Sequence, residues 1–204
     1  MRYTSALTVL EYMRHNYGRR QSISEICRGV DLSYQPTHFH IKELEAIGVI
    51  GTTKAGRESI CMFVNTTTTA LWLGMLCNNW APETSGIVGE LAHRLHPYIR
   101  RNYSAFDCIA VFADENRLIA VPKTANPQPS ESIITRCEAI SGALRAEIYS
   151  AGEFMDHLET PSGILWAQSA TVIKGHQEFW QYALAAGENL GLVLPDSHSL
   201  YSAT

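Results

Sequence analysis

The sequence lacks the features that mark several large classes of protein. Its longest apolar run, residues 70–77, has eight residues, whereas a membrane-spanning helix needs about 20. Residues 1–10 contain no apolar block followed by a small-residue cleavage site, so we expect no secretory signal. The five cysteines are scattered without a Cys-x-x-Cys pair, which argues against a disulfide scaffold or a zinc ribbon. These absences favour a cytoplasmic protein with reduced thiols and no membrane partner.

Motifs of the common catalytic sites are missing as well. The chain has no Gly-x-Ser-x-Gly, no Walker loop and no His-Glu-x-x-His. His93 and His96 could share one face of a helix, but no third ligand can be named, so we interpret them as a surface pair. We therefore expect no metal, no cofactor and no catalytic residue.

Composition and charge indicate a globular chain with a weak charge asymmetry. Of the 204 residues, 46% are hydrophobic and 18% are charged, which is enough apolar material for one large or two small domains. Residues 1–68 carry eight bases and six acids, while the rest carries eight bases and fourteen acids. This mild positive excess matters for nucleic-acid binding only if the bases converge on one face.

The first 68 residues predict three helices followed by a two-stranded ribbon. Ser22 and Glu25 have the spacing of a capping box at the start of the second helix, and Gly48 ends the third. Gly56 provides the hairpin turn, because glycine adopts a positive φ at little cost. The expected helices cover residues 4–17, 23–30 and 33–47, and the expected strands cover 49–54 and 58–64.

This order of elements resembles the winged-helix regulators of the MarR and ArsR type, especially archaeal ones. The matching segments are Ile23-Ser24-Glu25-Ile26, Leu32-Ser33-Tyr34 and the run from Ile41 to Ile50, in which a helix end is followed by glycine and two aliphatic residues. The resemblance implies that residues 1–68 form a winged helix-turn-helix domain whose partner is double-stranded DNA.

The resemblance makes the third helix the recognition helix, with the hairpin as a wing. Gln35 on its outward face can form two hydrogen bonds with adenine, while serine, tyrosine and lysine side chains can hold phosphates. We alternatively consider that these are ordinary solvated residues on a winged helix that binds protein. Phe39 lies off the apolar stripe and could pack under the wing. The candidate DNA-binding residues are Ser33, Tyr34, Gln35, His38, Lys42, Lys54 and Arg57.

Residues 69–103 are expected to form a helical connector. The four threonines at 66–69 suit a cap and linker, and helices are predicted over residues 70–80 and 84–103. The first of these is apolar nearly all round and must be buried, which favours a homodimer through Leu71, Leu73 and Leu76. The competing interpretation is that this helix packs only on its own C-terminal domain.

The remaining residues, 104–204, predict a small sheet covered by helices, which makes the whole chain α+β. A loop is expected over residues 122–129, and the segments after residue 158 are expected to continue an alternation of elements. Strands are predicted at 108–112, 118–121 and 147–149, helices at 131–144 and 150–158, and further elements at 164–170, 171–173 and 178–186.

This half distantly resembles small nucleotidyltransferase-like domains that follow winged helices in archaeal proteins. The residues that carry the resemblance lie at 148–154, 164–166 and 172–175. Active members of that family have a Gly-Ser turn and an Asp-x-Asp pair that binds Mg²⁺. Here the turn is absent, and Asp114 and Glu115 are adjacent, so that on a strand they would face opposite sides. The resemblance therefore implies the scaffold without the reaction.

Together these patterns predict a DNA-binding transcriptional regulator with a non-catalytic C-terminal domain that senses a small-molecule effector or mediates assembly. Two alternatives stay open. One is a divergent nucleotidyltransferase attached to a winged helix, and the other is a winged-helix module that assembles with protein.

Overall fold

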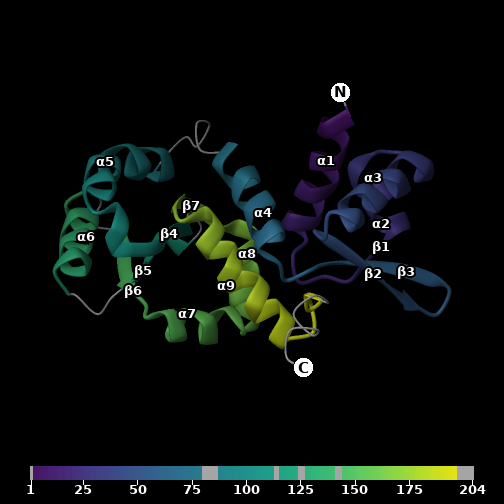
Figure 1. The fold of residues 1–204 in the computed structure, drawn as a ribbon. Helices are drawn as coiled ribbons and strands as arrows, with labels where there is room; N and C mark the ends of the chain where they lie inside the picture. Colours follow the sequence, from purple (N-terminus) through teal and green to yellow (C-terminus); the bar gives the residue numbers. More distant parts are fainter. Residues whose placement is uncertain (1, 80–86, 113–114, 124–126, 141–143, 197–204) are drawn as a thin grey trace.

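The computed structural model describes residues 2–79, 87–112, 115–123, 127–140 and 144–196, which form a mixed α+β structure with two separate sheets (Figure 1). A three-stranded sheet belongs to the N-terminal part, and a four-stranded sheet belongs to the C-terminal part. The helices α4 and α9 lie between the two sheets in the view of Figure 1. The predicted α+β class is confirmed at this level.

The N-terminal part consists of three helices and an antiparallel sheet of order β1-β3-β2. Strand β1 has two residues, and its Gln21 is paired with Cys61 of β3. Sequence patterns do not reveal a strand this short, because two residues show no alternation. The elements are α1 (Arg2–His15), β1 (Gln21–Ser22), α2 (Ile23–Val30), α3 (Tyr34–Ala46), β2 (Ile50–Ala55) and β3 (Glu58–Phe63).

Local chemistry at the helix ends explains why this part was well predicted. The Ser22 backbone N donates to Glu25 Oε2 at 2.7 Å, and the Glu25 N donates to Ser22 Oγ at 3.3 Å. This capping box satisfies two of the N–H groups that a helix start leaves without partners. Gly56 has φ 62° in the turn between β2 and β3. The capping box and the hairpin are therefore confirmed.

Helix α4 (Thr67–Asn79) begins inside the threonine run, three residues before the expected start. Thr66 Oγ1 accepts a hydrogen bond from the Thr69 N at 3.0 Å and so caps the helix. The Thr69 hydroxyl is buried and bonds the Gly48 carbonyl at 3.3 Å. The threonines thus serve as the cap and the first turn, and they fasten α4 to the end of α3 rather than forming a linker.

The C-terminal sheet has the order β6-β5-β4-β7. Strand β5 is antiparallel to β4 and parallel to β6, and α6 makes the crossover between β5 and β6. Helix α6 begins at Pro127, although a loop was expected through residue 129; proline is tolerated in a first turn, where its missing N–H costs no hydrogen bond. The elements are α5 (Ile87–Arg101), a 3₁₀ turn η2 (Tyr103–Ala105), β4 (Phe106–Phe112), β5 (Arg117–Pro122), α6 (Pro127–Ile140) and β6 (Arg145–Ile148).

After β6 the chain forms two consecutive helices, so the expected alternation of elements is wrong here. Residues 164–170 fall largely in α8, which has Thr160 as its N-cap and Pro161 in its first turn. The Thr160 Oγ1 accepts from the Gly163 N at 3.1 Å. This cap and the following proline are helix-start signals that sequence reasoning could have used. The elements are α7 (Ala151–Leu158), α8 (Pro161–Ser169), β7 (Thr171–Lys174) and α9 (His176–Asn189).

Strand β4 is buried on both faces, and its side chains alternate between two apolar layers. Ile109 and Val111 pack with residues of α5 and α6, whereas Ala110 and Phe112 pack with residues of α4, α8 and α9. Phe106 lies in the same layer as Ile109 despite its even number, because the register shifts between Phe106 and Cys108. Such a bulge reverses the alternation of side chains.

The N-terminal and C-terminal parts share one hydrophobic core around Tyr17. Its hydroxyl donates to the Ala183 carbonyl of α9, and its ring lies 5.7 Å from the Trp180 ring at 70°. On its other side Tyr17 stacks on Phe63 of β3 at 6.4 Å. The Gln168 Nε2 of α8 donates to the Tyr17 carbonyl at 2.6 Å. The expected division after residue 68 therefore crosses a continuous core.

We expect this fold to lose stability below about pH 6.5, the ordinary histidine value. Burial lowers the pKa of both His157 and His176, and each has an Nε2 atom without a hydrogen-bond partner among the described residues. Since the unfolded chain binds these protons more readily, falling pH favours unfolding until the folded pKa values are passed. The melting temperature should drop between pH 7.5 and 5.5, and His176→Gln should reduce that drop.

The exposed His93 supplies the control for this measurement. The His93→Gln variant should keep the full difference in melting temperature between the two pH values. An unchanged difference in His176→Gln would contradict the assignment of His176.

Candidate nucleic-acid interface

Helix α3 has a buried side and an outward side. Thr37, Ile41 and Leu44 are buried against the rest of the N-terminal part. Tyr34 and Gln35 are exposed at the start of the helix. This division follows from the helical period, which places residues three and four positions apart on one face.

The predicted residues at the start of α3 lie on its outward side, although His38 is less exposed than the others. Ser33 occupies the N-cap position and is exposed, but its side chain makes no capping hydrogen bond. His38 is half-buried, and its ring stacks on the Tyr34 ring at 5.8 Å with an angle of 17° between the planes. Stacking holds this imidazole along the helix surface, next to the exposed phenol.

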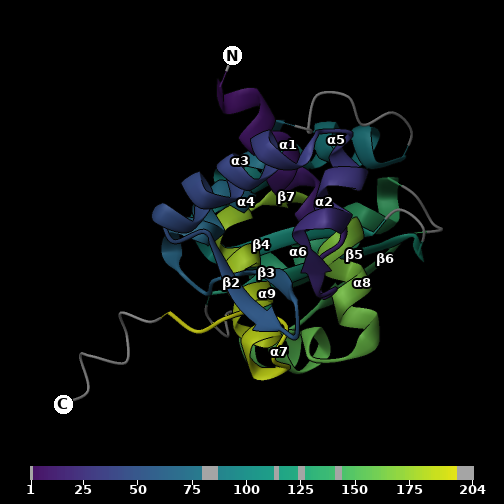
Figure 2. The ribbon, with the colours of Figure 1, turned by 90° about the vertical axis from the view of Figure 1, so that its right-hand side faces the viewer.

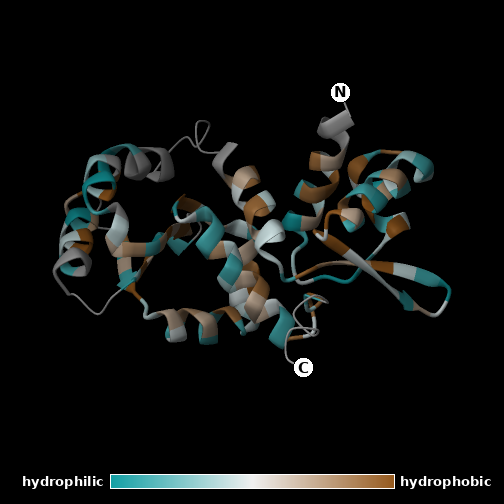
Figure 3. Ribbon diagram, in the orientation of Figure 1, coloured by the Kyte–Doolittle hydropathy of each residue, from teal (hydrophilic) through white to brown (hydrophobic). Residues whose placement is uncertain are grey.

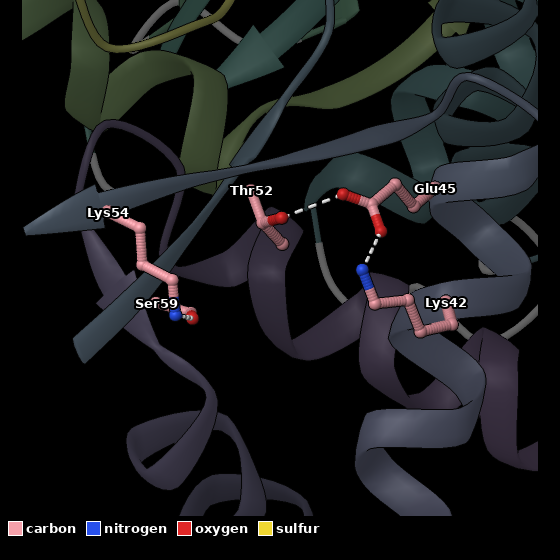
Figure 4. A network of polar contacts seen from close by, with 5 residues as sticks. All are labelled: Lys42, Glu45, Thr52, Lys54 and Ser59. Atoms are coloured by element: carbon pink, nitrogen blue, oxygen red, sulfur yellow. Dashed lines mark hydrogen bonds and ion pairs between the residues drawn. The ribbon is translucent and has the colours of Figure 1, made fainter. Parts of the chain in front are cut away.

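Lys42 is held by an intramolecular partner (Figure 4). Its Nζ forms an ion pair with Glu45, and the other oxygen of that carboxylate accepts from Thr52 Oγ1 of β2 at 2.7 Å. Partial burial acts to raise the pKa of Glu45, but the hydrogen bonds from Lys42 and Thr52 outweigh it, and the net pKa is lowered. Glu45 therefore stays ionised near neutral pH, fastens α3 to β2 and neutralises Lys42.

The two basic residues of the β2–β3 hairpin lie at its outer end, which is hydrophilic (Figure 3). Lys54 is exposed, and its Nζ donates to Ser59 Oγ of the neighbouring strand at 2.8 Å. Arg57 is exposed in the turn that joins Ala55 to Glu58. Figure 1 shows that α3 and the hairpin lie at the same end of the molecule, away from α5 and α6, and this end faces the viewer in Figure 2.

Charges of both signs occur on this surface. Lys42, Lys54 and Arg57 are accompanied by three acids, Glu43, Glu45 and Glu58. The predicted bases thus lie on one end of the molecule but do not create a strongly positive face. Any binding there would depend less on phosphate neutralisation than is usual for basic DNA-binding surfaces.

Phe39 is not among the candidate surface residues predicted from the sequence. It is 49% exposed, so it is not buried under the hairpin, which the sequence had left open. Its ring and the neighbouring His40 ring are in edge-type contact, with 5.5 Å between their centroids. The spacing indicates its exposure, because Gln35, Phe39 and Lys42 are four and three residues apart and therefore share one helix face.

The residues predicted to form a dimer divide between the core and the surface. Leu73 and Leu76 are buried within the single chain, where α4 packs closely along α9, so they are not available to a second copy. Leu71 is 46% exposed, and Met75, one turn further on, is also exposed. The competing interpretation, in which α4 packs on its own C-terminal part, accounts for Leu73 and Leu76.

Of the two acids considered for nucleotidyl transfer, Glu115 forms contacts with neighbouring side chains. Glu115 accepts a hydrogen bond from Trp166 Nε1 at 2.9 Å and pairs with Arg117 Nε at 3.4 Å. Asp114 lies outside the described residues. Within the described ranges, no group of three or more His, Cys, Asp or Glu side chains is placed to hold a metal ion.

Comparison of the chain with protein-family models, with curated proteins and with solved structures finds no match. Among the helices that the structure describes, none combines the length and the apolar character needed to cross a bilayer.

Proposed function

We propose that this protein is a winged-helix regulator that reads duplex DNA through α3 and the β2–β3 hairpin. The observation that carries the proposal is the order helix, strand, helix, helix, strand, strand with a sheet of order β1-β3-β2, which leaves the outward face of α3 and the hairpin end exposed together. In winged helices of the MarR and ArsR type, such a helix enters the major groove and the hairpin contacts the flanking backbone.

The assigned roles follow from the side chains. Gln35 reads a base, because its amide can donate to and accept from adenine. Lys54 and Arg57 contact phosphates. Lys42 contacts a phosphate only when its ion pair with Glu45 is broken, so its contribution to DNA affinity is smaller than its exposure suggests. The C-terminal part catalyses no reaction in this proposal and serves in sensing or assembly.

The test is selection from a random duplex library, followed by affinity measurements at several salt concentrations. Lys54→Ala or Arg57→Ala should weaken binding to all sequences and flatten the salt slope by about one unit. Gln35→Ala should relax selectivity at one base pair and cost about 1–3 kcal/mol. Arg145→Ala, an exposed arginine on β6, should leave binding unchanged.

Absence of duplex binding at low salt would overturn this proposal in favour of a protein-binding module. The exposed aromatic residues Tyr34 and Phe39 on α3 favour that second function, since exposed aromatic side chains are common anchors of protein interfaces. Under it, Phe39→Ala would abolish capture of the partner, whereas Arg57→Ala would have little effect.

We also propose that the regulator acts as a homodimer through the exposed side of α4. Leu71 and Met75 are two large apolar side chains one turn apart on that side. Two half-sites bound by linked recognition helices raise affinity through effective concentration.

A further inference from the structure

A pocket of about 580 Å³ lies where the end of α1 meets the C-terminal part. Helix α1 contributes Arg14 to its wall, β4 contributes Phe112, α8 contributes Trp166, and β7 contributes Val172. The pocket therefore joins the unit that carries α3 to the sheet of the C-terminal part.

Arg14 is a buried cation without an acidic partner among the described residues. The residue is 6% exposed, its Nη2 lies 2.9 Å from His15 Nε2, and its Nε has no hydrogen-bond partner. Guanidinium has five N–H donors and stays charged. Burying such a charge is costly unless a counter-ion and hydrogen-bond acceptors compensate. On its own helix, the described compensation is the contact with His15 and the negative end of α1, whose last turn contains Arg14.

His15 does not supply the missing negative charge. Burial and the neighbouring Arg14 lower the pKa of this imidazole, while Glu11, 3.9 Å away, acts in the opposite direction. The neutral ring can accept one hydrogen bond from Arg14. Among the described residues, no carboxylate forms an ion pair with Arg14.

Part of the pocket wall is aromatic. The Trp166 ring lies 4.6 Å from the Phe112 ring on one side and 3.6 Å from the His157 ring on another. The hydrogen bond from its Nε1 to Glu115 fixes its orientation. Phe112 and Trp166 are almost fully buried, and Leu165 of the same lining is exposed, so this part of the wall suits an apolar body that packs beside the aromatic side chains.

The charges of the wall limit how many negative charges a ligand can carry. Arg14 is the arginine of the lining, and Glu115 lies on the same wall, where Arg117 already pairs with it. A polyphosphate would place several charges near this carboxylate with one guanidinium to meet them. A single carboxylate at Arg14 leaves no charge unmatched.

We propose that this pocket binds a small organic monocarboxylate, with the carboxylate paired to Arg14 and a planar apolar body against Phe112 and Trp166. The inference rests on the sensing role proposed above and gives its ligand class. Bidentate pairing of guanidinium with carboxylate gives both strength and orientation.

The probe is 4-(trifluoromethyl)benzoate, followed by ¹⁹F NMR with the full-length chain, and its neutral amide is the matched ligand control. The benzoate signal should broaden on addition of protein, and the amide should bind at least about tenfold more weakly. Arg14→Met should abolish benzoate binding, whereas Arg19→Met, which removes an exposed arginine, should not change it.

Thermal melting of the ligand-free variants separates a binding role from a structural one. If Arg14 serves to bind an anionic ligand, the ligand-free Arg14→Met variant should melt at the same or a higher temperature. The substitution replaces an unpaired buried charge with an apolar side chain of similar length. A lower melting temperature together with unchanged benzoate binding would assign Arg14 to the fold and overturn the proposal.

A second pair of variants does not touch the core. Ser169 lines the pocket and is exposed. Ser169→Glu should weaken benzoate binding severalfold by repulsion, and Ser169→Gln should have little effect. Absence of benzoate binding at millimolar concentration, or equal binding of acid and amide, overturns the proposal. Duplex binding by the same samples is measured separately, so failure of the DNA-binding proposal would be recognised independently.

Discussion

Replacing Leu73 with glutamate is expected to unfold the chain under conditions in which the Leu71→Glu variant stays folded. Leu73 is fully buried where α4 packs on α9, whereas Leu71 is 46% exposed two residues earlier on the same helix. Glutamate at 73 would bury a carboxylate without a partner and remove a packed leucine, at a combined cost of about 4 kcal/mol or more. At 71 the same change should alter the free energy of unfolding by about 0.5 kcal/mol or less in the monomer.

Urea unfolding of the two variants, followed by tryptophan fluorescence, checks this expectation. The midpoint should fall steeply for Leu73→Glu, with the slope of the transition unchanged if unfolding stays two-state. Equal stability of the two variants would show that α4 does not pack on α9 as described.

The same pair of variants separates folding from association. Light scattering of Leu71→Glu should show a folded monomer if the exposed side of α4 forms the proposed homodimer. If the wild-type chain is itself monomeric at micromolar concentration, the dimer proposal fails, while the expectation for Leu73 is unaffected.

The second large effect is expected at Gly175, between β7 and α9. This residue has φ 70°, and a Cβ added to it would lie 1.8 Å from the Asp107 carbonyl oxygen of β4. Backbone cannot move aside as a flexible side chain can, because Asp107 is held from two directions: Lys174 Nζ donates to its carbonyl at 3.3 Å, and Tyr182 donates to its carboxylate at 2.9 Å. We expect Gly175→Ala to cost at least about 3 kcal/mol, combining left-handed strain with overpacking.

Gly191 provides the matched control, because it has φ 68° and no atom lies within 4 Å of an added Cβ. Gly191→Ala should therefore show only the cost of the backbone conformation, about 1 kcal/mol, or roughly 2–4 °C in melting temperature. The difference between the two variants measures the close approach of β4 to the β7–α9 junction. Similar melting temperatures for both variants would contradict that approach.

Features that depend on neighbouring residues were largely predictable. The second helix was predicted with the observed bounds, because Ser22 and Glu25 interact across three residues. Ser150 and Glu153 form a second capping box and mark the start of α7. On α3, helical spacing alone separates the exposed Gln35 from the buried Ile41. Interactions within one or two turns require no knowledge of the rest of the chain.

The sequence alone indicated that α4 needs burial, since it is apolar nearly all round, but only the tertiary structure decided which side is buried and against what. Helix α4 packs on α9, about a hundred residues further along the chain, and Leu73 is buried in the core that the two helices share. Arg14 is similar. A basic residue in the last turn of a helix is usually solvated, and Arg14 is buried because α4, β4, α8 and β7 lie around it in the folded chain. A pattern of residues records which side chains need burial, but the partner that buries them is set by contacts between distant segments, which leave no periodic signal in a single sequence.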